Sequence, residues 1–168
     1  MMSKGGSVDI QELEEFRKKL EETFSGDQLY SFIESCAKEL AARLLAKVIK
    51  RTPVGTYPKG SGKKGGTLRR GWTAGKQQDA TAYAQSLKVN HFGDMYVIEI
   101  INPVEYAPYV EFGHRQEPGR FVPAIGKRLK QGWVEGKFML TISEQEIQKD
   151  APRVLENKLK KKLGECFK

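Results

Sequence analysis

Residues 27–52 read DQLYSFIESCAKELAARLLAKVIKRT. Apolar side chains recur in this stretch at three- and four-residue steps, which is the spacing of one face of an α-helix. They are Leu29, Phe32, Ile33, Cys36, Leu40, Leu44, Leu45, Val48 and Ile49. Pro53 ends the predicted helix, because the residue before a proline avoids helical geometry. An apolar stripe this wide has to be buried along its length, so we expect a sheet or a partner to cover it.

A second, shorter helix is predicted before this one, over residues 10–24. Asp9 is a suitable N-cap, and Ser25-Gly26-Asp27 ends the pattern. Its apolar positions also follow helical spacing, at Ile10, Leu13, Phe16, Leu20 and Phe24. Residues 9–52 are therefore expected to form a helical N-terminal part.

Residues 53–76 are predicted to be a long flexible basic loop. They contain seven glycines and six basic residues but no acidic residue. A connection this long within a domain is generally functional or disordered. We expect a basic arm that contacts a neighbouring subunit or DNA, formed by Lys59, Lys63, Lys64, Arg69, Arg70 and Trp72. The alternative is a solvated loop, and a P-loop is excluded because Lys64 stands where Ser or Thr is required.

The middle region, residues 77–126, is predicted to contain a β-hairpin that turns at Phe92-Gly93-Asp94. Its second strand, residues 95–101, is apolar on both faces apart from Glu99, which predicts a central strand packed against the long helix. The pattern of residues 67–73 fits either a strand or a short helical turn.

Residues 127–168 are predicted to be a C-terminal helical extension. We expect a basic helix over residues 125–131, a linker over 133–139, and a short helix to Asp150 that begins with a capping box of Ser143 and Glu146. A last helix then opens at Pro152. Its docking face is predicted to consist of Leu155, Leu159, Leu163 and Phe167.

The fold class expected for residues 1–168, taken as a single domain, is α+β, with a small antiparallel sheet on the long N-terminal helix.

Composition indicates a soluble globular protein, with 39% hydrophobic and 30% charged residues. The apolar runs are too short to span a bilayer, and the N-terminus lacks the apolar stretch of a secretory signal. Cys36 and Cys166 are expected to be reduced thiols, and no metal or cofactor is predicted. The net charge of +8 is concentrated in residues 53–76 and in the C-terminal extension, where polyanions could be met.

No arrangement of residues predicts catalysis, so the chain is expected not to be an enzyme. Glu111 lies near His114 and Arg115 in sequence, and we interpret these three as a local ion pair that braces a turn rather than as an acid–base site. Tyr106 and Tyr109 are the amphipathic type of side chain that often anchors interfaces. A hydrolase that uses Glu111 and His114 is the least favoured alternative.

The run VEYAPYVEFGHR at residues 104–115, followed by PGRFVPA at 118–124, resembles the central motif of phage tail-completion proteins, which join head to tail in long-tailed bacteriophages and defective prophages. The resemblance implies an α+β subunit that forms a ring, usually of six copies, where the head connector meets the tail. The segment from Trp133 to Phe167 resembles the version found in phages with contractile tails.

From this resemblance we expect a structural virion protein of the phage neck, assembled in the host cytoplasm. Its partners would be other copies of itself, head connector or adaptor proteins, a tail tube or tail terminator protein and packaged DNA, with no membrane. The subunit interface is predicted at Tyr106, Tyr109, Glu111, Phe112, His114 and Arg115. The main alternative is a small accessory protein that binds nucleic acid non-specifically.

Overall fold

The computed structural model describes residues 11–57, 59–76, 78–93, 95–123 and 126–165. The predictions that involve Asp9, Ile10, Cys166 and Phe167 lie outside these residues, as do the side chains of Leu13 and Phe16.

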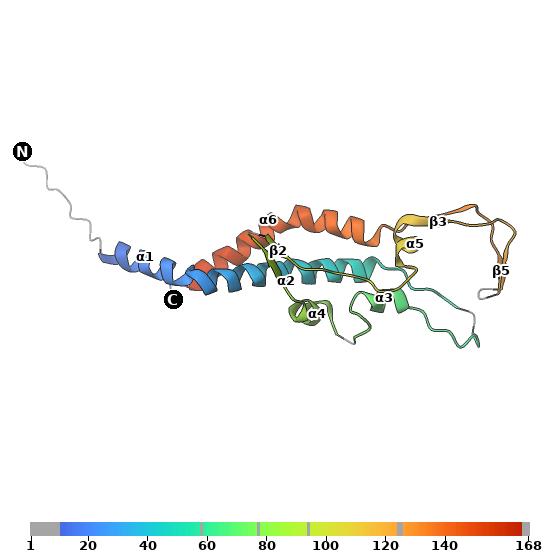
Figure 1. Ribbon diagram of the computed structural model, residues 1–168, viewed down its shortest axis with the longest axis horizontal. Coiled ribbons are helices and arrows are strands. Elements are labelled where there is room, and N and C mark those ends of the chain that lie inside the picture. The colour runs from blue at the N-terminus through green and yellow to red at the C-terminus, as the bar shows by residue number, and fades with distance from the viewer. Residues whose placement is uncertain (1–10, 58, 77, 94, 124–125, 166–168) are drawn as a thin grey trace, which may run out of the picture.

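Two long helices, α2 (Gly26–Arg51) and α6 (Met139–Glu165), lie side by side and run in opposite directions (Figure 1). Three residues of the predicted apolar stripe, Cys36, Leu45 and Val48, are buried in α2. Ala41 and Ala42, which the predicted stripe did not include, are buried with them. Helix α1 (Gln11–Thr23) continues beyond one end of the pair. The two predicted N-terminal helices are thus confirmed, and the surface that covers the longer one comes from both the middle and the C-terminal parts of the chain.

Helix α6 differs from its prediction, because one continuous helix replaces the short helix and the last helix. Pro152 lies inside it rather than at a new start. Ser143 does not cap a helix; its hydroxyl donates a hydrogen bond of 2.6 Å to the carbonyl oxygen of Met139 one turn earlier. Glu146 contacts α2 instead of completing a capping box, since its carboxylate lies 2.9 Å from Lys47 Nζ and 2.6 Å from Arg51 Nη2.

These contacts make the attachment of α6 to α2 dependent on pH. The hydrogen bond from Lys47 and the positive charge of Arg51 lower the pKa of Glu146 below its ordinary value of 4.5. A carboxyl group with a lowered pKa in the folded state stabilises that state above its unfolded pKa, and this contribution is lost as the pH falls through the folded pKa. The pKa of Lys47 is raised above 10.5 by the same hydrogen bond, so its contribution is fully present below pH 10.5 and is lost as the pH rises through the raised pKa.

We therefore expect Glu146→Gln to lower the melting temperature slightly near pH 7, and we expect this difference to shrink as the pH falls through the lowered pKa of Glu146, because the wild-type carboxyl then becomes protonated as well. Melting curves recorded by circular dichroism between pH 3 and pH 8 test this. Glu144→Gln, which changes an exposed carboxyl of the same helix, serves as the control. A difference between wild type and Glu146→Gln that stays constant across this range contradicts the prediction.

Two short helices lie after residue 66. The first falls within the segment that was predicted to be a flexible loop, and it settles the open alternative for residues 67–73 in favour of helix. The two helices are α3 (Thr67–Gly71) and α4 (Ala80–Ser86), and the side chain of Asp79 caps α4 by accepting a 2.7 Å hydrogen bond from the backbone N–H of Ala82. Helix α4 packs along α2. The core between these helices and the start of α6 contains Ala41, Ala42, Leu45, Val48, Leu68, Trp72, Ala84, Ala107 and Met139.

The β structure consists of three two-stranded antiparallel pairs within the described residues. The first, β1 (Asn90–Phe92) with β2 (Met95–Val97), is the predicted hairpin. It is not central, however: β2 ends at Val97, and Met95 and Val97 are exposed. The residues that follow leave the strand, and Ile98 and Ile100 pack against the core. The predicted α+β class is confirmed, with small hairpins in place of one sheet.

The other two pairs overturn the predictions of a basic helix and a linker within residues 126–135. β3 (Gly113–Arg115) pairs with β6 (Trp133–Glu135), and β4 (Phe121–Val122) pairs with β5 (Lys127–Arg128). Backbone hydrogen bonds from Gln116 to Gly132 and between Arg120 and Leu129 join the two pairs. Strands therefore stand where a basic helix and a linker were expected. We call residues 113–123 together with 126–135 the ribbon.

Candidate assembly surface

The central motif folds as the short helix α5 (Ala107–Phe112), with Pro108 in its first turn, where a missing N–H costs nothing. One side of α5 faces the core, since Ala107 and Glu111 are only 8% and 6% exposed. The opposite side carries Tyr106, Tyr109 and Phe112, which are 45%, 57% and 62% exposed. Three of the six predicted interface residues thus form an exposed aromatic surface, which we call the α5 face.

Glu111 has a different role from the one predicted, because it binds the first turn of α6. Its carboxylate accepts hydrogen bonds from the backbone N–H groups of Leu140 and Thr141 at 3.0 and 2.9 Å, and from the Thr141 hydroxyl at 2.8 Å. The first N–H groups of a helix lack partners within the helix, and a carboxylate there satisfies them. The expected ion pair with His114 and Arg115 is therefore wrong, and Glu111 is an internal cap rather than an exposed contact residue.

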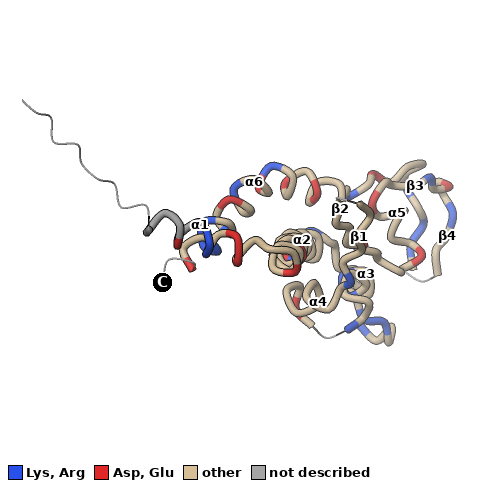
Figure 2. The backbone as a smooth tube through the Cα atoms, turned by 60° about the vertical axis from the view of Figure 1, so that its left-hand side comes forward, with Lys and Arg blue, Asp and Glu red and all other residues tan. Residues whose placement is uncertain are grey.

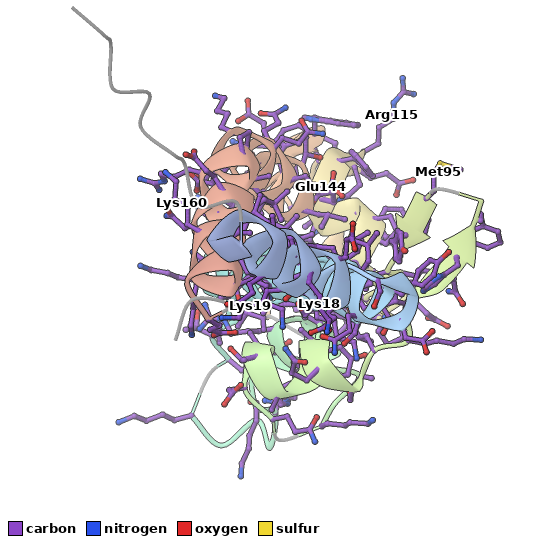
Figure 3. All side chains as sticks on the ribbon, turned by 90° about the vertical axis from the view of Figure 1, so that its left-hand side faces the viewer. Lys18, Lys19, Met95, Arg115, Glu144 and Lys160 are labelled. Atoms are coloured by element: carbon purple, nitrogen blue, oxygen red, sulfur yellow. The ribbon has the colours of Figure 1, made fainter. Side chains whose placement is uncertain are left out.

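His114 and Arg115 lie just beyond α5, in strand β3. The imidazole of His114 lies near the Tyr109 carbonyl oxygen and the Gln116 side-chain amide, at 3.4 and 3.3 Å, and meets the Tyr109 ring edge to face. Arg115 is exposed and extends away from the body (Figure 3). His114 thus supports the α5 face from one side, whereas Arg115 belongs to the ribbon.

The ribbon leaves and rejoins the body at one point beside α5. Backbone N–H groups of Lys137 and Phe138 donate to the carbonyl oxygens of Val110 and Glu111, at 2.8 and 3.0 Å. Gly113 has φ +85°, a left-handed conformation that favours glycine, and a Cβ there would collide with the Val134 carbonyl oxygen. A Cβ on Gly136 would likewise collide with the backbone of α5.

An open groove of about 330 Å³ lies next to the α5 face, between α5, the start of α6 and residues 100–102. Its lining is mainly apolar and includes Trp72, Ile101, Phe112 and Leu140. Ile101 is 59% exposed. Exposed apolar surface around a groove is typical of a protein–protein contact.

The β1–β2 hairpin forms a second exposed apolar surface, which we call the hairpin tip. Phe92 and Met95 are 61% and 64% exposed, and Figure 3 shows Met95 at the outer end of the hairpin. The base of the hairpin is fixed to α2, where His91 Nε2 lies 2.9 Å from Glu34 Oε1 and its ring lies 4.4 Å from the Tyr96 ring. The tip is thus held out from the helices in a defined position.

The predicted basic arm divides into two parts with different environments. Lys59, Lys63 and Lys64 are exposed, and Lys63 Nζ lies 6.0 Å from the centre of the Tyr57 ring. Arg70 is exposed too, although its guanidinium contacts the Gly65 carbonyl oxygen at 3.3 Å. These four residues remain available to a partner.

Arg69 and Trp72, by contrast, belong to the folded body. The Arg69 guanidinium donates two hydrogen bonds, of 3.1 and 2.7 Å, to the Thr52 carbonyl oxygen. Trp72 is 4% exposed, and its indole N–H donates a 2.7 Å hydrogen bond to the Thr52 hydroxyl. The prediction that Trp72 lies on an arm as a stacking group is therefore wrong, because its ring packs in the core.

The predicted docking face of the last helix is partly covered by the molecule itself. Leu155 and Leu163 are half-buried and Leu159 is 39% exposed, while the buried positions of α6 are Met139, Ser143, Ile147 and Val154. Lys158 Nζ donates a 2.6 Å hydrogen bond to the Ser35 carbonyl oxygen of α2. The side of α6 expected to meet a partner is thus turned in part toward α2.

Three further observations concern the described residues only. No group of three or more His, Cys, Asp or Glu side chains in them could hold a metal ion. None of their helices is both long enough and apolar enough to cross a membrane. The thiol of Cys36 is free and buried, and burial raises its pKa.

Comparison with known proteins assigns the part of the chain that carries the α5 face. The model of the HK97-gp10-like family, described as "Bacteriophage HK97-gp10, putative tail-component", matches residues 14–113, which is more than half of the chain. This chain belongs to the HK97-gp10-like family. Its role is therefore that of a structural component of a phage particle, in contact with other phage structural proteins. No curated protein and no solved structure matches the chain significantly.

The HK97-gp10-like match ends at Gly113, where α5 meets the ribbon. The basic loop, the hairpin and the α5 face lie within it, whereas the ribbon and α6 lie beyond it. Sequence reasoning missed the ribbon. The signals that could have revealed it are Pro123 and Gly126, which mark a turn, between the strand-forming residues Phe121 and Trp133.

Proposed function

We propose that this protein is a tail-completion subunit that joins head to tail, and that it assembles as a ring of six copies in the phage neck. The ring would lie between the head connector or adaptor proteins and the tail tube or tail terminator protein. Membership of the HK97-gp10-like family supports the phage structural part of this proposal. The resemblance of residues 104–124 to head-to-tail joining proteins supports the position.

The observation that carries the proposal is the presence of two different exposed apolar surfaces, the α5 face and the hairpin tip. A closed ring requires a head-to-tail contact, in which one surface of each subunit meets a different surface of the next. Exposed aromatic side chains beside a groove are suited to the buried centre of such a contact. We propose that the hairpin tip of one copy meets the α5 face and its groove on the next.

A native mass spectrum of the purified protein, with and without a short duplex, tests the proposal. A species with the mass of six chains that forms without duplex supports the ring. A monomer that gains mass only with duplex favours the alternative of a non-specific nucleic-acid-binding accessory protein. A monomer that ignores duplex, and that is also absent from the neck of assembled particles by electron microscopy, contradicts the joining role.

The α5 face gives a sharper test. We expect the double change Tyr109→Ser and Phe112→Ser to abolish the ring species while leaving the subunit folded, because both side chains are more than half exposed. Native mass spectrometry measures the ring and circular dichroism the fold. The control is Leu159→Ser, which removes an exposed apolar side chain from α6. Rings that persist in the double variant would show that the α5 face is not a subunit contact.

A further inference from the structure

The ribbon is a positively charged feature that the proposed function leaves unused. Its described residues contain five basic and two acidic side chains, a net charge of +3. The basic residues are Arg115, Arg120, Lys127, Arg128 and Lys130, and all five are exposed. Figure 2 shows blue Lys and Arg segments on the ribbon, in the part of the tube labelled β3 and β4.

Aromatic side chains alternate with these basic ones in a fixed register. Arg115 stands opposite Trp133 in the β3–β6 pair, and Phe121 stands opposite Arg128 in the β4–β5 pair. Residues directly opposite each other in an antiparallel pair share a face, so each pair presents a cation beside an apolar ring. Trp133 and Phe121 are 50% and 51% exposed. An open hollow of about 660 Å³ runs along this part of the ribbon, lined among others by Arg115, Arg120 and Phe121.

The ribbon also shares one end of the molecule with the basic loop. Both project from the same end of the α2–α6 pair, opposite the end that carries α1 (Figure 1). Lys59, Lys63 and Lys64 of that loop are exposed, and residues 53–76 contain no acid. This end therefore has a positive potential that a polyanion would experience before contact.

From these observations we infer that the ribbon binds the phosphate backbone of duplex DNA, without regard to base sequence. The major groove of B-DNA is about 12 Å wide and admits a two-stranded β-ribbon. Lys and Arg side chains that neutralise phosphates release condensed counterions, which supplies non-specific affinity. The exposed rings add apolar contact with sugars or bases. An acidic protein surface would satisfy the charges but would make less use of the paired rings.

The inference goes beyond the joining role and does not depend on ring formation, because it concerns residues outside the proposed subunit contacts. The ribbon variant combines Arg120→Gln, Lys127→Gln and Lys130→Gln. The control variant combines Arg153→Gln, Lys160→Gln and Lys161→Gln, which removes the same charge from exposed positions of α6. Binding is measured by fluorescence anisotropy with a labelled 20-base-pair duplex of arbitrary sequence, in full-length protein, between 50 and 200 mM salt.

We expect the ribbon variant to bind duplex at least about tenfold more weakly than wild type. The slope of the logarithm of the binding constant against the logarithm of the salt concentration should become shallower by about 0.9 for each phosphate that is no longer neutralised. The control variant should stay within about threefold of wild type. Arg120→Gln and Lys130→Gln alone should each reduce the salt slope by about 0.9, which guards against misfolding of the triple variant. Circular dichroism checks that every variant is folded.

Three outcomes would overturn the inference. Equal losses in the ribbon and control variants would mean that net charge alone is responsible. Absence of duplex binding by wild type would leave the ribbon without this ligand. Equal affinity of wild type for poly-glutamate and duplex would point to an acidic protein surface instead. Native mass spectra of the same samples report ring formation separately, so failure of the joining role and failure of this inference can be told apart.

Discussion

Replacing Trp72 with alanine will lower the free energy of unfolding by about 3–5 kcal/mol, the range measured when a large aromatic side chain is removed from a core. Trp72 is 4% exposed and belongs to the core cluster with Leu45, Val48 and Met139. Its indole N–H also binds the Thr52 hydroxyl, which in turn donates a 2.6 Å hydrogen bond to the Val48 carbonyl oxygen at the end of α2. The substitution therefore removes packing and a buried hydrogen bond together.

The chain has one other tryptophan, and it provides a matched control. Trp133 is 50% exposed in the ribbon, so Trp133→Ala is expected to change the free energy of unfolding by no more than about 1 kcal/mol. Urea titrations followed by circular dichroism measure both variants. If Trp72→Ala is as stable as Trp133→Ala, Trp72 does not pack in the core, and the expectation that it lies on a flexible arm would have to be restored.

Replacing Glu111 with alanine is the second change with a large expected effect, a loss of about 2–4 kcal/mol. Loss of an N-terminal cap costs about 0.5–2 kcal/mol. Each buried donor left without a partner adds about 1–3 kcal/mol, and water can reach some of these donors once the side chain is shortened. Both backbone N–H groups and the Thr141 hydroxyl lose their acceptor in this variant. Helix α6 should then separate from the core first.

Hydrogen exchange followed by mass spectrometry detects this directly, because the amides of residues 139–147 should exchange faster in Glu111→Ala. Glu117→Ala is the control, since Glu117 is exposed and has only a 4.0 Å contact with Arg120. Glu111→Gln keeps one carbonyl oxygen as an acceptor and should fall between wild type and alanine. Unchanged protection of α6 in Glu111→Ala would show that the cap is not what holds the start of this helix.

Local periodicity was enough to predict the two N-terminal helices. The apolar spacing of residues 27–52 and the proline after it give the extent of α2 and part of its buried side, since Cys36, Leu45 and Val48 are buried as expected. Ala41 and Ala42 are buried as well, although the predicted stripe did not include them. The hairpin at residues 90–97 was also predictable, because its turn residues are local. Pro152, however, suggested a helix start where α6 is continuous. Contacts of α6 with α2 on both sides of Pro152, from Glu146 to Arg51 and from Lys158 to Ser35, outweigh the preference of proline for a first turn.

The parts that could not be predicted depend on partners distant in sequence. Residues 125–131 are rich in basic side chains that suit a helix, yet Lys127 and Arg128 pair with β4 because the ribbon closes on itself. Glu111 has charged neighbours in sequence, but the groups it binds are about thirty residues away. The residues next to Trp72 in sequence do not show whether its side chain lies on an exposed arm or in the core. The structure shows that it lies in the core, where its indole binds the Thr52 hydroxyl.

The two ends of the ribbon lie against each other beside α5, held by the bonds from Lys137 and Phe138 to that helix. A segment whose ends meet can be lengthened, shortened or replaced at little cost to the rest of the molecule, since closing a longer loop adds only about 0.6 kcal/mol per doubling of its length. The ribbon is therefore a segment that can be exchanged for another without rearranging the helices. Its reach and charge can thus change without disturbing the frame that α2, α5 and α6 form.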